Sequence, residues 1–301
     1  SFFIYISISK NQVIKDRLVH YFVLSIYINL FIVTVFNFIN WDLKFIDTEE
    51  IKRFKGYLNI LTILVLILPF IKKTKMNIVA YLFLIPNLWL SNCNSAILGI
   101  LIALIALSVF YIYQNIFRFK ILFYALFFIA LTLSSQILLN LPENLDKESI
   151  QTQKFIVPTF LVDVHRQYIW SFSIKKISEK PLLGYGPDTS NFIEGSQEII
   201  GSKYTGTMPY IPSHPHNFIL EIILDTGLIG LVGFIFFIFY YNFKIFRKSD
   251  DKGKFLLILF FFYFWGSSLV NFSFWLGWWQ VSYFFITSLI SSFNLSKNQK
   301  T

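Results

Sequence analysis

The sequence has few charged residues and almost no cysteine. Asp, Glu, Lys and Arg make up 14% of its 301 residues, whereas an ordinary soluble domain has about 25%. Hydrophobic residues make up 55%, and they gather in runs close to the roughly 20 residues that span a bilayer as a helix. This balance excludes a soluble enzyme and a disordered chain. Because Cys93 is the only cysteine, a disulfide scaffold is excluded too.

The basic excess does not predict a nucleic-acid partner. The formal net charge is +9, but in a membrane protein such an excess usually reports which loops face the cytoplasm. The sequence opens with Ser1 and an apolar stretch that ends at Lys10. We interpret this stretch as the tail of a membrane helix that begins further upstream, with a disordered or interfacial terminus as the alternative. It is not a signal peptide, because it lacks a basic start and a small-residue cleavage site.

The apolar segments predict an all-α fold, a polytopic transmembrane helix bundle with one large helical extracytoplasmic loop. N-terminal transmembrane helices are expected in residues 1–139, the outer loop in 140–217 and C-terminal transmembrane helices in 218–301. As a single helix, residues 77–112 would reach about 54 Å, beyond a bilayer core of about 30 Å, so a hairpin is predicted there. The predicted spans are 18–38, 57–71, 77–91, 96–112, 121–139, 218–241, 255–275 and 280–295.

The distribution of basic residues orients these spans. If the segment before residue 18 is cytoplasmic, the inside segments hold 15 basic and 3 acidic residues, and the outside segments hold 11 basic and 12 acidic ones. This is the bias that the positive-inside rule requires. It predicts that residues 140–217 are extracytoplasmic and that 243–254 are cytoplasmic.

A helix is predicted within the outer loop at residues 159–179. Thr159 is a suitable N-cap for it, and Arg166 and Trp170, four residues apart, share one face. In one interpretation the helix lies on the membrane surface with Arg166 in solvent; in the other, Arg166 has a binding role. The apolar positions that recur at spacings of three to four are Leu161, Val164, Tyr168 and Phe172.

A glycine-rich segment follows this helix. Gly184 and Gly186 flank Tyr185, with prolines on either side. Such a stretch turns tightly and can present backbone N–H groups to an anion. A plain turn explains the same residues.

A polar segment opens the sixth predicted span. Asn217 is a suitable N-cap, and Glu221 and Asp225 follow in steps of four, so the three side chains share one face. Asp225 is expected about 12 Å below the cap, where a carboxylate should face protein or water. Three glycines at a spacing of three predict close helix packing: Gly227, Gly230 and Gly233.

His214 and His216 precede that cap and raise the question of a metal. They supply only two ligands, and no compact group of Cys, His and Asp completes a set, so neither a metal nor another cofactor is predicted. The sequence has no serine-nucleophile motif, P-loop or dinucleotide motif.

Residues from about 90 to 235 resemble the O-antigen ligase and O-antigen polymerase superfamily. The resemblance rests on Arg166 followed by Trp170, on P-x-x-G-x-G ending at Gly186, and on H-x-H-N-x-x-L-E with the following D-T-G-L-I-G-L, which together run from His214 to Leu231. It implies a bacterial inner-membrane protein with its large loop in the periplasm. Such proteins transfer a glycan from an undecaprenyl-pyrophosphate carrier to a lipid or glycan acceptor hydroxyl, without a metal.

The resemblance gives the polar residues expected roles. Arg166 grips phosphate, because a guanidinium can bind it bidentately. His216 is the expected base that deprotonates the acceptor hydroxyl, and His214 is the second choice. Glu221 is expected to orient His216, and Asp225 to do so through an intermediary. The expected substrate-binding residues are Gly184, Gly186, Trp170, Asn217, Glu221 and Asp225.

The sequence departs from the family at two points, and two alternatives stay open. Members usually have more spans before this region, and many have Ser-Arg where this sequence has Ser91-Asn92, so one arginine expected to help hold the pyrophosphate is absent. Glu221 and Asp225 can instead serve an ion path in a bicarbonate-type transporter. A member that lacks the arginine can also be an inactive scaffold.

Overall fold

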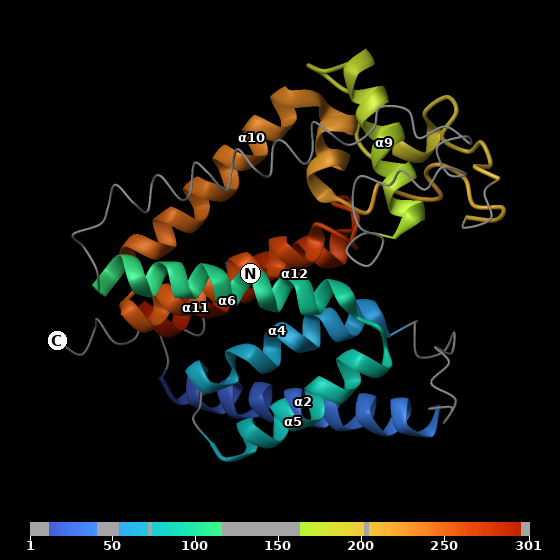
Figure 1. Ribbon diagram of the computed structural model, residues 1–301. Coiled ribbons are helices and arrows are strands. Elements are labelled where there is room, and N and C mark those ends of the chain that lie inside the picture. The colour runs from blue at the N-terminus through green and yellow to red at the C-terminus, as the bar shows by residue number, and fades with distance from the viewer. Residues whose placement is uncertain (1–11, 41–53, 72–73, 116–162, 202–204, 296–301) are drawn as a thin grey trace. The chain divides into compact units, whose positions relative to one another are not determined.

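The computed structural model describes residues 12–40, 54–71, 74–115, 163–201 and 205–295 (Figure 1). Every named element in these residues is a helix, which confirms the all-α prediction. The helices are α2 (Gln12–Ile39), α4 (Lys55–Ile71), α5 (Met76–Leu90), α6 (Asn94–Asn115), α9 (Val164–Glu179), the short 3₁₀ helix η2 (Ser190–Phe192), α10 (Phe218–Lys248), α11 (Asp251–Ser268) and α12 (Gly277–Leu295).

Helices lie at most of the predicted spans. Three described segments are long and apolar enough to cross a membrane, namely Val19–Ile39, Asn94–Tyr113 and Phe218–Lys248. Residues 77–112 form two helices and not one, as predicted, because α5 ends at Leu90 and α6 begins at Asn94. The predicted span 121–139 and the opening stretch 1–10 lie outside the described residues.

The prediction of one span over residues 255–275 is wrong at its C-terminal end, although a helix occupies residues 255–268. The helix α11 ends at Ser268 and α12 begins at Gly277. The residues between them, 269–276, form a non-helical segment that we name the 269–276 strap. Its backbone and side-chain polar groups bond to carboxylates elsewhere in the chain, as described below, and this replaces the bonds that a continuous helix would have made.

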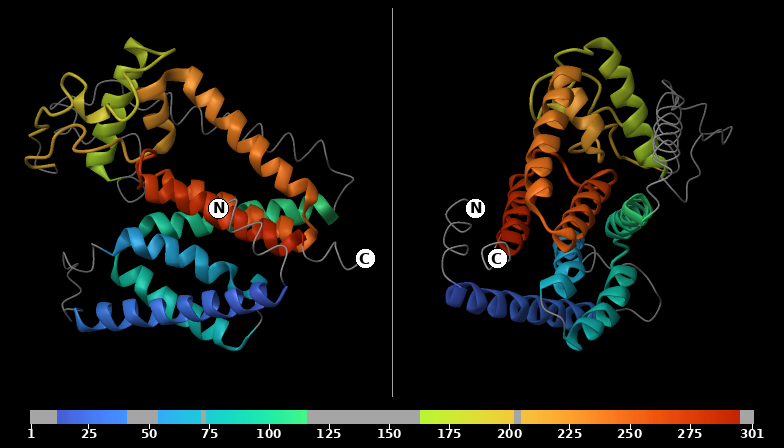
Figure 2. Two further views of the ribbon diagram at one scale, coloured as in Figure 1. Left: turned by 180° about the vertical axis from the view of Figure 1, so that it is seen from behind. Right: turned by 90° about the vertical axis from the view of Figure 1, so that its left-hand side faces the viewer.

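The chain divides into two compact units. Unit 1 comprises Ser1–Ser108, Tyr240–Ser268 and Gly277–Thr301, and unit 2 comprises Val109–Phe239 and Leu269–Leu276. Within unit 1, α2 packs against α4 and α5 (Figure 2). Asn37 on α2 donates a buried hydrogen bond to Asn87 on α5 at 2.7 Å, the kind of polar contact that joins helices in apolar surroundings.

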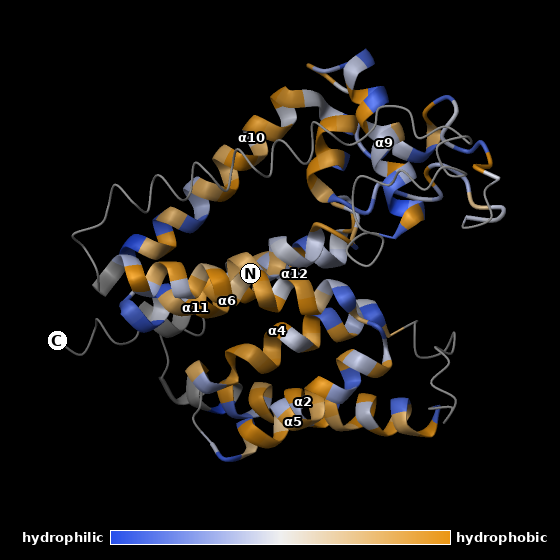
Figure 3. Cartoon of the chain, viewed as in Figure 1, coloured by the Kyte–Doolittle hydropathy of each residue, from blue (hydrophilic) through white to orange (hydrophobic). Residues whose placement is uncertain are grey.

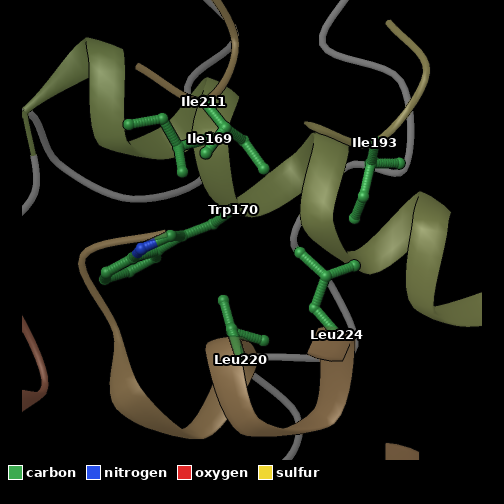
Figure 4. Packing of buried hydrophobic residues seen from close by; sticks show 6 residues of the cluster. All are labelled: Ile169, Trp170, Ile193, Ile211, Leu220 and Leu224. Carbon is green, nitrogen blue, oxygen red and sulfur yellow. The ribbon is translucent and has the colours of Figure 1, made fainter. Parts of the chain in front are cut away.

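Unit 2 has its core between α9 and the beginning of α10. Six buried side chains form it, and Figure 4 shows them converging from α9, from the irregular chain after it and from α10: Ile169, Trp170, Ile193, Ile211, Leu220 and Leu224. This core fixes α9 against the segment of α10 that carries the polar face, and so it positions the candidate site.

Candidate functional site

The first residue of the site region is the N-cap of α9. The helix begins at Val164, and Asp163 caps it by accepting a hydrogen bond from the backbone N–H of Arg166 at 2.9 Å. The prediction that Thr159 caps a helix beginning at 159 is therefore wrong for α9, and Thr159 lies outside the described residues. A carboxylate is a good cap because it also interacts favourably with the positive end of the helix dipole.

Asp163 also holds the side chain of Arg166. Its Oδ2 accepts a hydrogen bond from Nη1 of Arg166 at 2.6 Å, and the arginine side chain is 32% exposed. The Nε of Arg166 is buried and has no hydrogen-bond partner in the described part of the chain. Arg166 is therefore anchored on one edge by a carboxylate while it keeps a donor unused, and it is not a freely solvated surface residue.

Trp170, one turn further along α9, reaches the histidine segment. Its Nε1 donates a hydrogen bond to the carbonyl of Pro215 at 3.0 Å, and its ring is buried in the core of unit 2. The structure therefore brings Trp170 to the backbone between the two histidines. This contact holds their position, whereas any contact with substrate stays a prediction.

The two histidines are arranged so that each has a defined role in hydrogen bonding. Their ring centroids are 4.1 Å apart. The backbone N–H of His216 donates to Nδ1 of His214 at 3.1 Å, so this nitrogen of His214 is an acceptor. The Nδ1 of His216 lies 3.0 Å from the carbonyl of Asn271. Because a carbonyl can only accept, Nδ1 of His216 carries the proton, and in the neutral ring Nε2 keeps its lone pair.

The surroundings favour the neutral form of both rings. Burial lowers the pKa of His214 to about 3, with further lowering by His216 and by the positive charge of Arg166. Burial also lowers the pKa of His216, the carbonyl of Asn271 opposes this shift, and Arg166 adds to it. Arg166 thus lies close enough to act electrostatically on both histidines, and the structure brings the three expected catalytic residues together.

Asn217 begins α10 as predicted. Its Oδ1 accepts hydrogen bonds from the backbone N–H groups of Ile219 at 3.0 Å and Leu220 at 3.2 Å. Glu221 and Asp225 follow along the same face, and all three side chains are buried. The cap therefore fixes the backbone directly after His216. His216 itself has a φ of 54°, a left-handed conformation that is uncommon for residues other than glycine.

The sequence led us to expect that Glu221 orients His216, but the two carboxylate oxygens of Glu221 bond elsewhere. Its two oxygens accept hydrogen bonds from the 269–276 strap, one from Oγ of Ser273 at 2.5 Å and the other from the backbone N–H of Phe274 at 2.6 Å. The strap also supplies the Asn271 carbonyl that binds His216. Glu221 and His216 therefore both bond to the strap, at residues that lie two and three positions apart.

Asp225 has a full set of donors as well. Its Oδ1 accepts from Oγ of Ser190 at 2.6 Å, and its Oδ2 accepts from Nε1 of Trp275 at 2.6 Å and from the backbone N–H of Asp188 at 3.1 Å. These donors come from the loop after α9 and from the strap. Asp225 thus joins three segments that are far apart in the sequence.

The glycine-rich segment has its N–H groups bonded within the fold. The N–H groups of Tyr185 and Gly186 donate to the carbonyls of Leu224 and Asp225 at 2.9 and 2.8 Å, and that of Gly184 donates to Lys180 at 3.1 Å. These bonds favour the plain turn over the presentation of N–H groups to an anion, and a role of Gly184 and Gly186 in substrate binding stays a prediction. Gly184 has a φ of 67°, and a Cβ there would lie 2.6 Å from the backbone of Asp225, so the glycine permits close docking on α10.

The prediction that Gly227, Gly230 and Gly233 allow close helix packing on α10 is also wrong at two of these positions. Gly227 has a φ of 66° and a ψ of −172°, so it interrupts the helix instead of packing it, and Figure 1 shows the change in direction of α10. Beyond the break, the N–H groups of Leu228 and Ile229 donate to the carbonyls of Pro181 and Leu182 at 2.9 and 3.4 Å. No atom lies within 4 Å of a Cβ built on Gly233, so this glycine makes no close helix contact among the described residues.

The sequence reasoning missed Asp163 and most of the 269–276 strap. Two polar residues, Asn271 and Ser273, interrupt the aromatic run there, and they were a usable signal that the helix ends. No group of three or more His, Cys, Asp or Glu side chains that could hold a metal ion occurs in the described residues.

The sequence similarities between this chain and known proteins include the residues of the candidate site. A family model described as O-antigen ligase matches residues 78–235. A Rickettsia conorii protein with the name "Putative polysaccharide ligase" is 31% identical over 140 residues, which are 46% of this chain and 32% of that protein. A Rickettsia felis protein of the same name is 46% identical over 68 residues, 22% of this chain and 16% of that protein. The chain thus matches about a third or less of these relatives' length, and no solved structure matches it.

Proposed function

Because the chain belongs to the O-antigen ligase family, we propose that it is a membrane glycosyltransferase of the polysaccharide ligase type. It transfers a glycan from an undecaprenyl-pyrophosphate carrier to a hydroxyl of a lipid or glycan acceptor. The location proposed for it is the bacterial inner membrane, with the site on the periplasmic side. The observation that carries the proposal is the placement of His216, whose Nδ1 lies 3.0 Å from the Asn271 carbonyl, in surroundings that lower its pKa and include the positive charge of Arg166.

The reaction needs a base and a cation, and these residues supply both. Nε2 of His216 takes the proton of the acceptor hydroxyl while that oxygen attacks the anomeric carbon of the donor sugar. The bond between this carbon and the pyrophosphate oxygen breaks, and its electron pair leaves with the pyrophosphate. Arg166 binds the charge that develops there, because its side chain is 32% exposed and the fork of donors on a guanidinium suits phosphate oxygens.

The anchored arginine supports this division of roles. Asp163 fixes one edge of the guanidinium, so less side-chain freedom is lost when phosphate binds. His214 is less suited than His216 to act as the base, because its Nδ1 already accepts the His216 N–H. The proposal therefore keeps His216 as the base and gives His214 the task of positioning it.

The contacts of the carboxylates support a holding role for them. Glu221 and Asp225 accept hydrogen bonds from fixed groups of the 269–276 strap and the loop after α9. An ion path needs carboxylates that exchange their partners during transport. Their network is better suited to keep the Asn271 carbonyl in place against His216.

The test is a variant that removes the base and keeps the backbone. Asn tolerates the left-handed conformation of residue 216, and its amide can still donate to the Asn271 carbonyl, but it cannot take a proton. His216→Asn is expected to lower glycan transfer roughly 10²–10⁴-fold at normal protein abundance. The measurement is polymer attached to its acceptor on a gel, in a strain that lacks the native protein.

His20 on α2 gives the matched control, because it is an exposed histidine in unit 1. His20→Asn should leave transfer at the wild-type level. Wild-type transfer by His216→Asn at equal protein abundance would falsify the assignment of the base.

A further inference from the structure

The exposed apolar part of α10 begins at its break and not at its first residue. The helix has 31 residues, about 46 Å, which exceeds a bilayer core of about 30 Å. No large hydrophobic side chain is exposed between Phe218 and Thr226, whereas exposure begins at Leu228 (45%) and Ile229 (60%) and continues along the helix. From Leu228 to Lys248 the helix is about 31 Å long, and Figure 3 shows this part mainly in apolar colours.

An exposed pair of leucines lies beside this first lipid-facing turn. Leu182 and Leu183 are 60% and 73% exposed. Their segment is fixed there by backbone contacts, since Ile229 N–H donates to the Leu182 carbonyl at 3.4 Å. A Cβ on Gly227 would lie 2.1 Å from the carbonyl carbon of Leu182, so no side chain separates the two segments.

The polar residues next to the leucines fit a membrane surface. Lys180 is exposed, and its Nζ lies 4.4 Å from the ring centroid of Tyr185. Lysine and tyrosine are typical of the headgroup level, where an apolar stem or ring faces the acyl chains and the polar end faces water. The order along the chain thus gives a cation, two exposed leucines and an aromatic ring at the level where the lipid-facing helix begins.

We propose that Leu182 and Leu183 insert into the acyl region of the adjoining lipid leaflet and anchor unit 2 to the membrane surface. The occupant of this surface is bilayer lipid, because the leucines continue the exposed apolar face of α10. The inference goes beyond glycan transfer and does not depend on it. The insertion would hold the site of His216 and Arg166 at a fixed distance from the bilayer, since the segment that carries the leucines bonds to both sides of the α10 break.

Fluorescence labelling tests the insertion. On a Cys93→Ser background, Leu183→Cys carries an environment-sensitive dye and is reconstituted into vesicles of phosphatidylethanolamine and phosphatidylglycerol without polyprenyl lipid. The matched control is Phe192→Cys, because Phe192 is 80% exposed but has no backbone bond to α10 among the described residues. We expect a blue-shifted emission that doxyl-labelled lipids quench at 183, and iodide quenching from water at 192.

A second label at Leu182→Cys guards against a local defect at a single position. The proposal holds if the labels at both leucines are shielded from iodide and quenched by the lipids. It is overturned if both are as accessible to iodide as the label at 192. Because the vesicles contain no donor lipid, a failure of this test is distinct from a failure of the proposed transfer reaction.

Discussion

The two parts of α10 differ in what covers them, although the sequence runs through both as one apolar stretch. Before Gly227 the helix is covered by unit 2 and carries Glu221 and Asp225 with all of their hydrogen bonds to protein. After Gly227 most of its large hydrophobic side chains are exposed, although Ile238 is buried. An apolar run therefore does not by itself define a membrane span, because protein can cover one part of a helix and lipid the next.

The loop after α9 makes this change of surroundings possible. A break leaves backbone N–H and C=O groups without partners, and in an apolar environment each costs several kcal/mol. The segment from Pro181 to Gly186 accepts from the N–H groups beyond the break and donates to the carbonyls before it. In this protein the P-x-x-G-x-G motif therefore supplies hydrogen-bond partners to the backbone on both sides of a broken helix.

The largest expected effect comes from closing the gap at the break. Gly227→Ala places a Cβ 2.1 Å from the Leu182 backbone at a φ of 66°, so we expect the docked loop to be displaced and the folded protein to be lost from membranes. Gly233→Ala is the control, because that position is open and alanine is the better helix former. Equal accumulation of the two variants on a blot would contradict the role of the close contact.

Loss of a buried carboxylate should have the next largest effect. Asp225→Ala leaves the Ser190 hydroxyl, the Asp188 N–H and the Trp275 Nε1–H without their acceptor. The Ser190 bond is buried and the other two are part-buried. Because a buried donor without an acceptor costs about 1–3 kcal/mol, we expect the free energy of unfolding to fall by about 3 kcal/mol. Tryptophan fluorescence during heating in detergent measures this loss.

The control for Asp225 is a carboxylate in the same unit that is exposed. Glu194→Ala should leave the melting temperature near that of the wild type, because Glu194 is exposed. If Asp225→Ala melts at the same temperature as Glu194→Ala, the network around Asp225 does not stabilise the break.

What the sequence predicted correctly depends on local patterns. Apolar runs located the helices, and the spacing of Asn217, Glu221 and Asp225 identified a cap and a shared face that are both present. Arg166 and the two histidines were chosen for their chemistry, and the fold brings them within electrostatic reach of one another.

What the sequence could not give depends on distant partners. Ser273 and Phe274 bind Glu221 from more than 50 positions away, so the hydropathy of residues 255–275 alone favoured a continuous helix. Thr159 was the only cap that the sequence suggested for this helix, whereas α9 is capped by Asp163, which also pairs with Arg166. The turn at Gly184 and Gly186 was recognised from the sequence, but its contact with the α10 break was not. Neither segment has a sequence pattern that identifies the other as its partner.

A moderate effect is expected from pH. The pKa of His214 is lowered to about 3 in the folded protein from an ordinary value near 6.5. Below pH 6.5 the unfolded chain therefore binds a proton that the folded chain does not, so stability falls as the pH decreases from 6.5 toward 3. We expect His214→Asn to lose less melting temperature between pH 7.5 and pH 5 than the wild type does.

The size of this pH effect is a few degrees, since about 1 kcal/mol shifts the melting temperature by roughly 2–4 °C in domains of 150–250 residues. The control is His20→Asn, whose histidine is exposed, and its pH dependence should match that of the wild type. Parallel curves for all three proteins would show that His214 is not held neutral by the fold.

The smallest expected effect tests how α9 covers the first part of α10. Trp170→Phe keeps most of the buried ring but removes the Nε1–H that donates to the Pro215 carbonyl at 3.0 Å. A hydrogen bond of this kind contributes about 1 kcal/mol, and the freed carbonyl lies between His214 and His216. We therefore expect a melting temperature lower by a few degrees, together with a severalfold drop in transfer. In the double variant, Trp170→Phe should add little to the larger loss that His216→Asn causes alone. Trp278→Phe is the control, because Trp278 is 45% exposed and belongs to unit 1. If both tryptophan variants retain wild-type transfer and stability, the contact to Pro215 does not position the histidines, and the core beneath Trp170 alone holds α9 in place.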